Sequence, residues 1–188
     1  MTDIRWGIVG PGRIAENVTS DFPHVDGARA VAVASRSAER AAAFAARHGI
    51  ERAYGSYAEI LADPDVDVLY VATPHPQHHA IAMAALRAGK ALLVEKAFTA
   101  TTAGAAEVVD LARQTGVFAM EAMWTRFQPA VVAVRELVAD GAIGEVRSVQ
   151  ADLGIAPEYD PAGRLFDLAL GGGALLDLGV YVVSFAQM

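Results

Sequence analysis

Short β-branched runs alternate with longer alanine-rich segments over the first two-thirds of the chain. The apolar runs at 4–9, 30–34, 66–72, 91–94 and 117–120 predict buried strands, with a shorter strand near Tyr54. The intervening segments have helical periodicity at about 12–22, 37–48, 57–62, 79–88 and 101–115. Strands joined by helices of this length pair in parallel, so the pattern predicts an α/β fold with a doubly wound parallel sheet.

The pattern changes after about residue 122. It predicts a helix over 129–140, a long alternating strand over 146–155, and an apolar helix over 174–188 that follows three glycines. We therefore expect two domains, a complete one at 1–121 and the beginning of an α+β domain at 122–188. One strand and two helices are too few to close a sheet. We expect the chain to be a fragment of a longer protein or to form a homo-oligomer that covers the strand and the last helix.

Composition excludes several classes of function. The 188 residues carry a net charge of −7, which argues against a nucleic-acid partner. There is no cysteine, which excludes thiol catalysis, thiolate metal sites and disulfides. The N-terminus does not resemble a signal peptide, and no apolar run reaches the ~18 residues of a membrane span. These features predict a cytoplasmic protein with no membrane partner.

A glycine-rich motif follows the first predicted strand and opens the first helix. In Gly10-Pro11-Gly12-Arg13-Ile14-Ala15, the first glycine suits a tight turn and Gly12 allows close approach of a pyrophosphate. The free N–H groups at the helix start, where Arg13 and Ile14 lie, favour phosphate binding. The alternative is a merely structural turn. Because the motif lies at the first strand-to-helix turn of an alternating chain, we predict a dinucleotide site.

The end of the second predicted strand bears on the choice of cofactor. An NAD site usually offers a carboxylate there for the ribose 2′-hydroxyl. This chain has Ser35 and Arg36 instead, with Arg40 one turn later. Hydroxyl and guanidinium groups suit a 2′-phosphate, which predicts NADP(H) in preference to NAD(H). The alternative is that Arg36 is a solvated residue at a helix start.

Lysine is scarce, and one lysine has a distinctive position. Of the 15 lysines and arginines, only two are lysines, Lys90 and Lys96. Lys96 follows the strand at 91–94, at the sheet edge where open α/β sheets bind ligands. A partly desolvated ammonium there suits hydrogen bonding or proton exchange with a substrate hydroxyl. The alternative is a surface lysine at a strand end.

Several segments, taken in order, resemble the Gfo/Idh/MocA family of NAD(P)-dependent oxidoreductases. They are GIVGPGRIA near the N-terminus, ATPHPQH at 72–78, LLVEK at 92–96, EAMWTRF at 121–127 and GGGALLDLGVY at 171–181. The last two segments resemble a branch of the family whose members act on diols and sugars. The resemblance implies a Rossmann-type sheet followed by a second domain, and hydride transfer with a nicotinamide cofactor.

The resemblance also implies roles for individual residues. It places Thr73, Pro74 and His75 near the nicotinamide. The predicted cofactor-binding set also includes His78, Glu95, Lys96, Trp124 and Arg126. His78 is interpreted as a residue at a helix start that packs beneath the cofactor loop. Trp124 and Phe127 form either an aromatic wall of the substrate pocket or plain core. His75, His78 and His79 lack a neighbouring carboxylate ligand, so we expect no metal.

The catalytic set implied by the resemblance is Lys96, Tyr181 and Asp177. The chain departs from the family pattern at Ala97, where proline is usual, and at Tyr181, where many members have histidine. A phenol can transfer the proton when a nearby cation such as Lys96 stabilises the phenolate. Asp177 and Tyr181 are four residues apart, which places them about 6 Å apart along one helix face. The alternative is that Asp177 bonds to a helix terminus and Tyr181 is core.

The function predicted from these features is hydride transfer between NADP(H) and a carbinol carbon of a polyol, sugar or cyclic diol. Lys96 and Tyr181 would exchange the hydroxyl proton, and Asp177 would orient the substrate hydroxyls. Two other interpretations stay open. One is a catalytically silent NADP-binding or regulatory protein, and the other is a structural partner that assembles through the strand at 146–155.

Overall fold

The computed structural model describes residues 3–188 of the chain. It divides into two compact units, Met1–Glu121 and Ala122–Met188, and the boundary falls where the sequence pattern changes.

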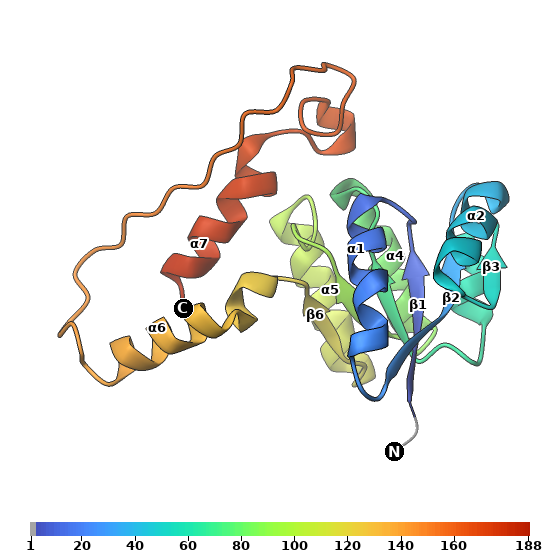
Figure 1. Ribbon diagram of the computed structural model, residues 1–188, viewed down its shortest axis with the longest axis horizontal. Helices are drawn as coiled ribbons and strands as arrows, with labels where there is room; N and C mark the ends of the chain where they lie inside the picture. The colour runs from blue at the N-terminus through green and yellow to red at the C-terminus, as the bar shows by residue number, and fades with distance from the viewer. Residues whose placement is uncertain (1–2) are drawn as a thin grey trace. The chain divides into compact units, whose positions relative to one another are not determined.

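Within residues 3–188, six strands form one parallel sheet in the first unit. The strands are β1 (Ile4–Val9), β2 (Ala28–Ala34), β3 (Arg52–Tyr54), β4 (Val68–Val71), β5 (Ala91–Val94) and β6 (Ala119–Glu121). Their order is β3-β2-β1-β4-β5-β6, with helices on both faces (Figure 1). This is the strand order of a Rossmann fold, so the predicted doubly wound sheet is confirmed.

The helices of the first unit lie close to their predicted ranges. They are α1 (Arg13–Asp21), α2 (Ala38–His48), α3 (Tyr57–Ala62), α4 (His78–Arg87) and α5 (Thr102–Thr115). Three of them begin after a capping residue, Ser37, Ser56 or Thr101, whose hydroxyl oxygen accepts a hydrogen bond from a backbone N–H group of the first helical turn. Gly49 and Gly116 end α2 and α5 in the left-handed conformation. The capping residues therefore account for the accuracy of these boundaries.

The core of the first unit lies between the sheet and its helices. Side chains from β1, β4 and β5 are fully or almost fully buried, among them Val9, Leu69, Val71, Leu92 and Val94. Gly7 of β1 leaves no room for a larger residue, because a Cβ atom there would lie 2.8 Å from Leu69 Cδ2 and 2.9 Å from Ile60 Cδ1. The small residues of the chain thus permit close packing of helix on sheet.

The second unit consists of helices and irregular chain. A 3-10 turn at Trp124–Phe127 leads to α6 (Pro129–Ala139), and a π-helical turn at Leu175–Gly179 continues into α7 (Val180–Ala186). Residues 145–160 have no regular secondary structure, so the predicted strand over 146–155 is wrong. A strand needs a neighbouring strand to receive its backbone hydrogen bonds, and the described structure of residues 122–188 contains no strand that could pair with 146–155.

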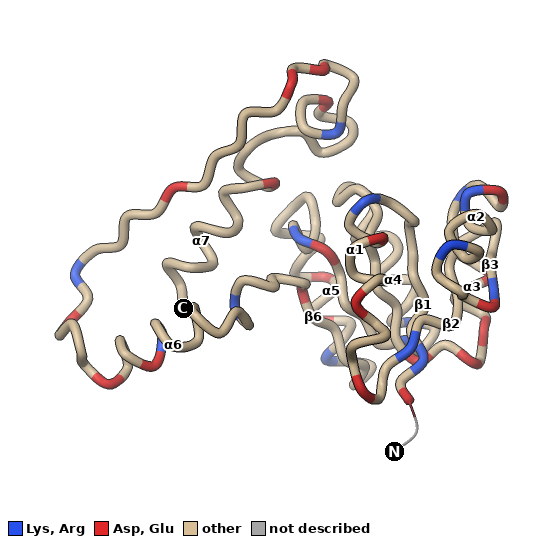
Figure 2. Tube along the Cα trace, in the orientation of Figure 1, with Lys and Arg blue, Asp and Glu red and all other residues tan. Residues whose placement is uncertain are grey.

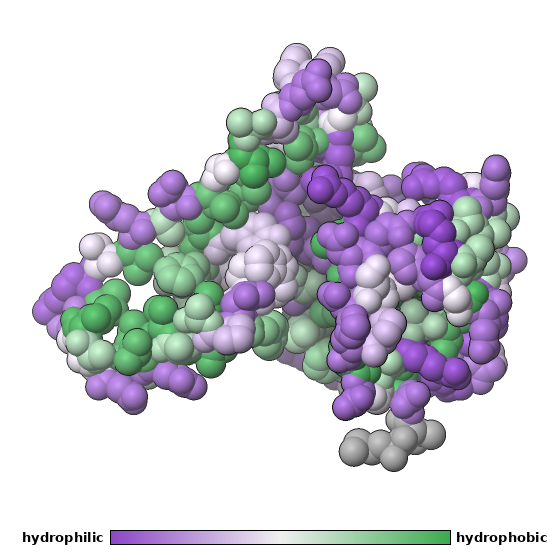
Figure 3. Space-filling model, in the orientation of Figure 1, coloured by the Kyte–Doolittle hydropathy of each residue, from purple (hydrophilic) through white to green (hydrophobic). Residues whose placement is uncertain are grey.

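Apolar side chains of the second unit are widely exposed. No residue of α6 is buried, and Leu137 of that helix is 56% exposed. Leu168 is 84% exposed. Figure 3 shows hydrophobic residues gathered over α6 and α7, and Figure 2 shows α7 without a charged residue. The exposed apolar surface lies on the helices and on the irregular chain at 146–159, and the expected homo-oligomer stays a prediction.

One described segment, Leu168–Ala186, is long and apolar enough to span a membrane by length and composition. The expectation that no apolar run reaches this length is therefore wrong. The segment is interrupted at Gly171, Gly172 and Gly173, and Asp177 within it pairs with Arg164. A single segment of this kind is weak grounds for a membrane span, because core helices pass the same criterion. The absence of a membrane or nucleic-acid partner stays a prediction.

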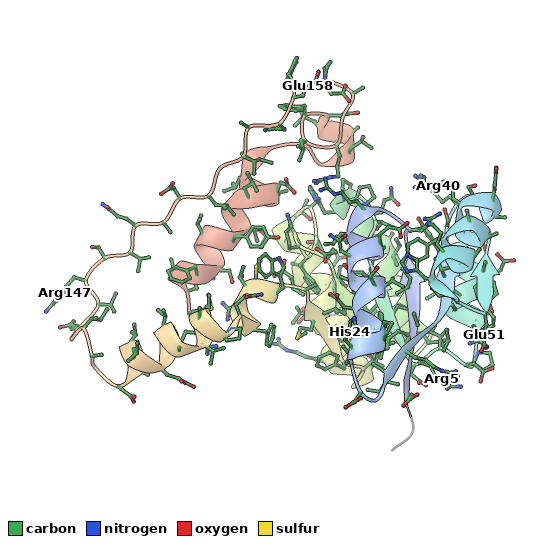
Figure 4. All side chains as sticks on the ribbon, in the orientation of Figure 1. Arg5, His24, Arg40, Glu51, Arg147 and Glu158 are labelled. Atoms are coloured by element: carbon green, nitrogen blue, oxygen red, sulfur yellow. The ribbon has the colours of Figure 1, made fainter. Side chains whose placement is uncertain are left out.

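A cluster of ion pairs closes the amino end of the sheet, where Figure 4 labels Arg5. The Arg5 guanidinium donates to both carboxylate oxygens of Asp67, at 2.8 and 3.0 Å, and to Asp65 at 2.6 Å. The backbone N–H of Arg5 also donates to Asp67 at 2.9 Å. These bonds lower the pKa of Asp67 from 3.8 to about 2. The pair ties the start of β1 to the turn that precedes β4.

We predict that Asp67→Asn lowers stability at neutral pH and reduces its acid dependence. The folded pKa lies below the ordinary value, so the contribution of Asp67 is present above about pH 4 and is lost as the pH falls towards 2. Because the side chain is 42% exposed, solvent screening limits the difference to about 1 kcal/mol at neutral pH. Urea unfolding across this pH range measures it. Asp110→Asn, on the surface of α5, is the control, and an equal effect there would contradict the prediction.

Candidate active site

The predicted site residues of the first unit follow the carboxyl ends of adjacent strands. The register aligns Ala34 with Val9, Val9 with Val71, Val71 with Val94 and Val94 with Glu121. Residues directly after this row begin the loops that carry Gly10, Ser35, Thr73, Glu95 and Lys96. The sheet thus brings to one edge side chains that lie far apart in sequence.

The glycine-rich loop lies between β1 and α1. Gly10 has a φ of +88°, and a Cβ atom there would lie 2.8 Å from Thr73 Cγ2. Gly12 is the N-cap of α1 and supplies no side-chain cap, so the first N–H groups of the helix are free for another acceptor. Around Gly12 a Cβ atom would meet only Ala72 O, at 4.0 Å. Arg13 and Ile14 form the exposed first turn of α1. This geometry fits an anionic pyrophosphate.

Thr73 faces this loop from the end of β4. Its side-chain oxygen is buried and has no hydrogen-bond partner in the described structure, which fits a polar ligand group at this position. The strand order reverses between β1 and β4, and open α/β sheets bind ligands at that point. Pro74 is partly exposed and His75 is 3% exposed. The placement of these three residues near the nicotinamide stays a prediction.

Ser35, Arg36 and Arg40 gather at the end of β2. Ser35 is buried, and its hydroxyl accepts the Ser37 N–H at 3.2 Å, which leaves its own O–H to donate. Arg36 is exposed. Arg40 donates to the Pro11 carbonyl at 3.4 Å and therefore joins α2 to the glycine-rich loop (Figure 4). The two guanidinium groups come from the loop after β2 and the first turn of α2.

Glu95 is a buried part of the scaffold rather than an exposed cofactor ligand. Its Oε1 accepts from the Tyr70 hydroxyl at 2.6 Å, and its Oε2 accepts from the backbone N–H of Lys96 at 3.2 Å. Burial raises the pKa of this carboxyl group. Its prediction as a cofactor contact is corrected, because both oxygens are used inside the fold. Lys96 is partly exposed beside it, and the Lys96–Ala97 peptide bond is cis.

His78 is likewise not positioned to touch a ligand. It is 0% exposed at the start of α4, and its two ring nitrogens lie within hydrogen-bond distance of backbone carbonyl groups. The prediction of a direct cofactor contact is therefore wrong, and the accompanying interpretation, packing beneath the cofactor loop, describes its place.

In the second unit, Asp177 and Tyr181 each have a partner. Asp177 Oδ1 accepts from Arg164 at 3.0 Å, and the Tyr181 hydroxyl accepts from Trp124 Nε1 at 3.1 Å. Asp177 lies in a π-helical turn, so the spacing expected of a regular α-helix does not apply there. The ion pair with Arg164 compensates the burial of the Asp177 carboxylate, so no bond from Asp177 to a helix terminus is needed to explain why it is buried.

Trp124, Phe127 and Arg126 lie on the 3-10 turn of the second unit. Trp124 and Phe127 are 53% and 64% exposed, so the interpretation as plain core is wrong. The rings of Trp124 and Tyr181 meet edge to face, 6.0 Å apart. Arg126 Nε donates to Ser184 Oγ at 2.9 Å and thus braces the turn against α7. Its contact with cofactor stays a prediction.

Sequence reasoning missed three polar residues of this arrangement, Tyr70, Glu121 and Arg164. Glu121 accepts the Phe98 N–H at 2.8 Å, and it ends the strand next to the one that Glu95 follows. A polar residue at the end of a buried strand was the available signal for Glu121. Arg164 lies in irregular chain, where no periodicity marks it. Among residues 3–188 no cluster of three His, Asp or Glu side chains could hold a metal ion, and the absence of a metal stays a prediction.

Comparison with known sequences assigns the chain to a family. Residues 4–123 match the Gfo/Idh/MocA oxidoreductases, described by their NAD-binding Rossmann fold, and residues 131–188 match that family's C-terminal domain. The chain belongs to the Gfo/Idh/MocA family. Trans-1,2-dihydrobenzene-1,2-diol dehydrogenase is 46% identical in Macaca fascicularis and 44% in Homo sapiens, over 187 residues. Each match covers 98% of this chain and 55% of the relative, so the chain spans about half the length of these relatives.

Solved structures of the family have the same fold. A 3-ketoreductase from Actinomadura kijaniata in complex with NADP and TDP-benzene has a TM-score of 0.87 at 34% identity, covering 96% of this chain and 55% of that one. Other structures of that enzyme replace a tyrosine by phenylalanine or a lysine by alanine. An NAD-binding oxidoreductase from Klebsiella pneumoniae has a TM-score of 0.80 at 30% identity, covering 99% and 52%. Family and fold together assign NAD(P) binding to the first unit.

We predict that alanine has different effects at the two glycines of the loop. Gly10→Ala combines a positive φ with a close contact to Thr73, so it should lower the free energy of unfolding by about 1–3 kcal/mol. Gly12→Ala meets no such contact, so it should leave stability within about 0.5 kcal/mol while its methyl group hinders the pyrophosphate. Urea unfolding and NADPH fluorescence titration measure the two effects. Full NADPH affinity in folded Gly12→Ala would contradict this use of the loop.

Proposed function

We propose that this chain belongs to an oxidoreductase that transfers hydride between NADP(H) and a carbinol carbon of a sugar, polyol or cyclic diol. The observation that carries the proposal is the carboxyl edge of the sheet. There the free end of α1, Gly10 and the unpartnered Thr73 hydroxyl meet where the strand order reverses.

The preference for NADP(H) rests on the end of β2. Ser35, Arg36, Ser37 and Ala38 place no carboxylate where an NAD site usually has one. The Arg36 guanidinium is exposed at that end, and Arg40 lies one turn later. Guanidinium groups bind a 2′-phosphate by charge-assisted hydrogen bonds, and the Ser35 hydroxyl supplies a further donor.

Lys96 and Tyr181 are proposed to exchange the proton of the reacting hydroxyl. Bound NADP(H) supplies or accepts the hydride at C4 of its nicotinamide ring. Oxidation of an alcohol also releases a proton, so a base or its relay must contact the reacting oxygen. Lys96 is partly exposed at the carboxyl edge, and the Trp124 bond orients the Tyr181 hydroxyl. The residue types replaced in the ketoreductase variants, a tyrosine and a lysine, are those of Tyr181 and Lys96.

Asp177 is proposed to orient the substrate hydroxyls. Its Oδ1 accepts from Arg164 at 3.0 Å, and a carboxylate can accept several hydrogen bonds, which suits contacts with substrate hydroxyl groups. The substrate class is supported by the relatives, which are named for a dihydrobenzene diol and for a keto group in a TDP-linked complex. A diol has carbinol carbons and a ketoreductase acts on a keto group, and carbinol and ketone are the two oxidation states of the reaction proposed for this chain.

We predict that Arg36→Ala weakens NADP(H) binding and leaves NAD(H) binding almost unchanged. Loss of a hydrogen bond to a charged group costs about 1.5–3 kcal/mol, which is roughly a 10- to 150-fold rise in Kd for NADP(H). Calorimetry with both cofactors measures it, with Arg113→Ala on the exposed face of α5 as the control. If the wild-type chain binds NAD(H) as tightly as NADP(H), the proposed preference is wrong.

We predict that Lys96→Ala and Tyr181→Phe lower kcat about 10²- to 10⁴-fold in a form of the protein that turns over. Binding of NADP(H) should change far less, because these groups are proposed to act on the substrate proton. Steady-state kinetics with sugars and diols, combined with NADPH titration, separate the two effects. Lys90→Ala is the control, since Lys90 caps the Asp63 and Val66 carbonyl groups and should affect stability instead. If only Lys96→Ala lowers kcat, Tyr181 has no part in proton transfer.

A further inference from the structure

His78 joins the two loops that carry the candidate site. Its Nε2 lies 2.7 Å from the Thr73 carbonyl oxygen, in the loop after β4. Its Nδ1 lies 2.9 Å from the Ala97 carbonyl oxygen, in the loop after β5. The ring is fully buried at the first residue of α4. One buried imidazole therefore links the loops that follow the adjacent strands β4 and β5, and it contacts the residue next to Lys96.

The chemistry of these two contacts makes the arrangement sensitive to protonation. A carbonyl oxygen only accepts, and a neutral imidazole has a single N–H donor. Burial lowers the pKa of His78, and the neighbouring His75 ring, 6.4 Å away, opposes a second charge. The backbone carbonyl groups of Thr73 and Ala97 favour the doubly protonated ring. When the ring takes up a second proton at lower pH, it can donate a hydrogen bond to both carbonyl groups instead of one.

We propose that His78 is a positioning residue that holds the Ala97 carbonyl through Nδ1 and thereby sets the place of Lys96. The role rests on the proposed function, since it matters for turnover only if Lys96 exchanges the substrate proton. The contact itself is a property of the folded first unit and can be tested without cofactor or substrate.

Two amide substitutions separate the two bonds. The His78→Asn amide nitrogen occupies nearly the place of Nδ1, so this variant keeps a donor for Ala97. The His78→Gln amide nitrogen occupies nearly the place of Nε2, so this variant keeps a donor for Thr73 and loses the one for Ala97. Each variant keeps a donor for one of the two carbonyl groups and has the same amide group, so a loss of stability alone affects both alike.

The scarcity of lysine supplies the readout. Reductive methylation with ¹³C-formaldehyde labels only Lys90 and Lys96 among the side chains, and Lys90→Arg assigns the two signals. We expect His78→Gln to shift the Lys96 methyl signal and its titration midpoint, and His78→Asn to leave both near the wild-type values. The Lys90 signal is the internal control, because Lys90 binds carbonyl groups at the other end of the sheet.

The outcomes are distinct. Equal Lys96 signals in the two variants, whether shifted or unshifted, would overturn the proposal. Should either variant fail to fold, ¹⁵N spectra of the wild-type imidazole decide: a proton on Nδ1 within the folded pH range supports the contact, and its absence throughout that range overturns it. In a form that turns over, kcat should fall more in His78→Gln than in His78→Asn. If the signals behave as expected and no turnover is found, the positioning contact stands and the proposed function fails.

Discussion

The register of the central strands is the constraint on which the site depends. The sheet hydrogen bonds continue one residue past three strand ends: Gly10 N donates to Ala34 O at 3.0 Å, Ala72 N to Val9 O at 2.8 Å, and Glu95 N to Val71 O at 2.9 Å. Each loop of the site therefore starts from a backbone group already fixed by its neighbour. A slip of one residue would turn the strand side chains to the opposite face and separate Gly10 from Thr73.

Beneath this edge lies a layer of buried polar contacts. These contacts fasten the loops of the site to the sheet. The Tyr70 hydroxyl donates to Glu95, and the backbone N–H of Phe98 donates to Glu121. The ring of His78 lies within hydrogen-bond distance of two backbone carbonyl groups. Unpaired polar groups at this depth would be costly, so the contacts fix the loop backbones in one arrangement. This layer explains why Glu95 and His78 occur in a motif that looks functional although neither side chain is placed to bind a ligand.

The two ends of the sheet differ in how their polar groups are used. At the amino end, Arg5 forms ion pairs with Asp65 and Asp67, and Lys90 donates hydrogen bonds to two backbone carbonyl groups. At the carboxyl end, the start of α1 and the Thr73 hydroxyl have no such partner in the described chain. One end is closed by its own ion pairs, and the other keeps donors for a ligand. The second unit has few such contacts, and its helices leave apolar surface exposed.

The sequence by itself determined the alternation of strands and helices, the capped helix boundaries and the loops that carry the site, because these follow from local periodicity and from residues such as Ser37 and Gly49. It also pointed to Gly10, Thr73 and Lys96, since strand ends in a parallel sheet share one edge. Only the tertiary structure decided that Glu95 and His78 face inward, because the direction of a side chain after a strand depends on what packs beneath it. The same holds for 146–155, whose alternating pattern forms no strand: a strand needs a hydrogen-bonding neighbour, and no local pattern can supply one.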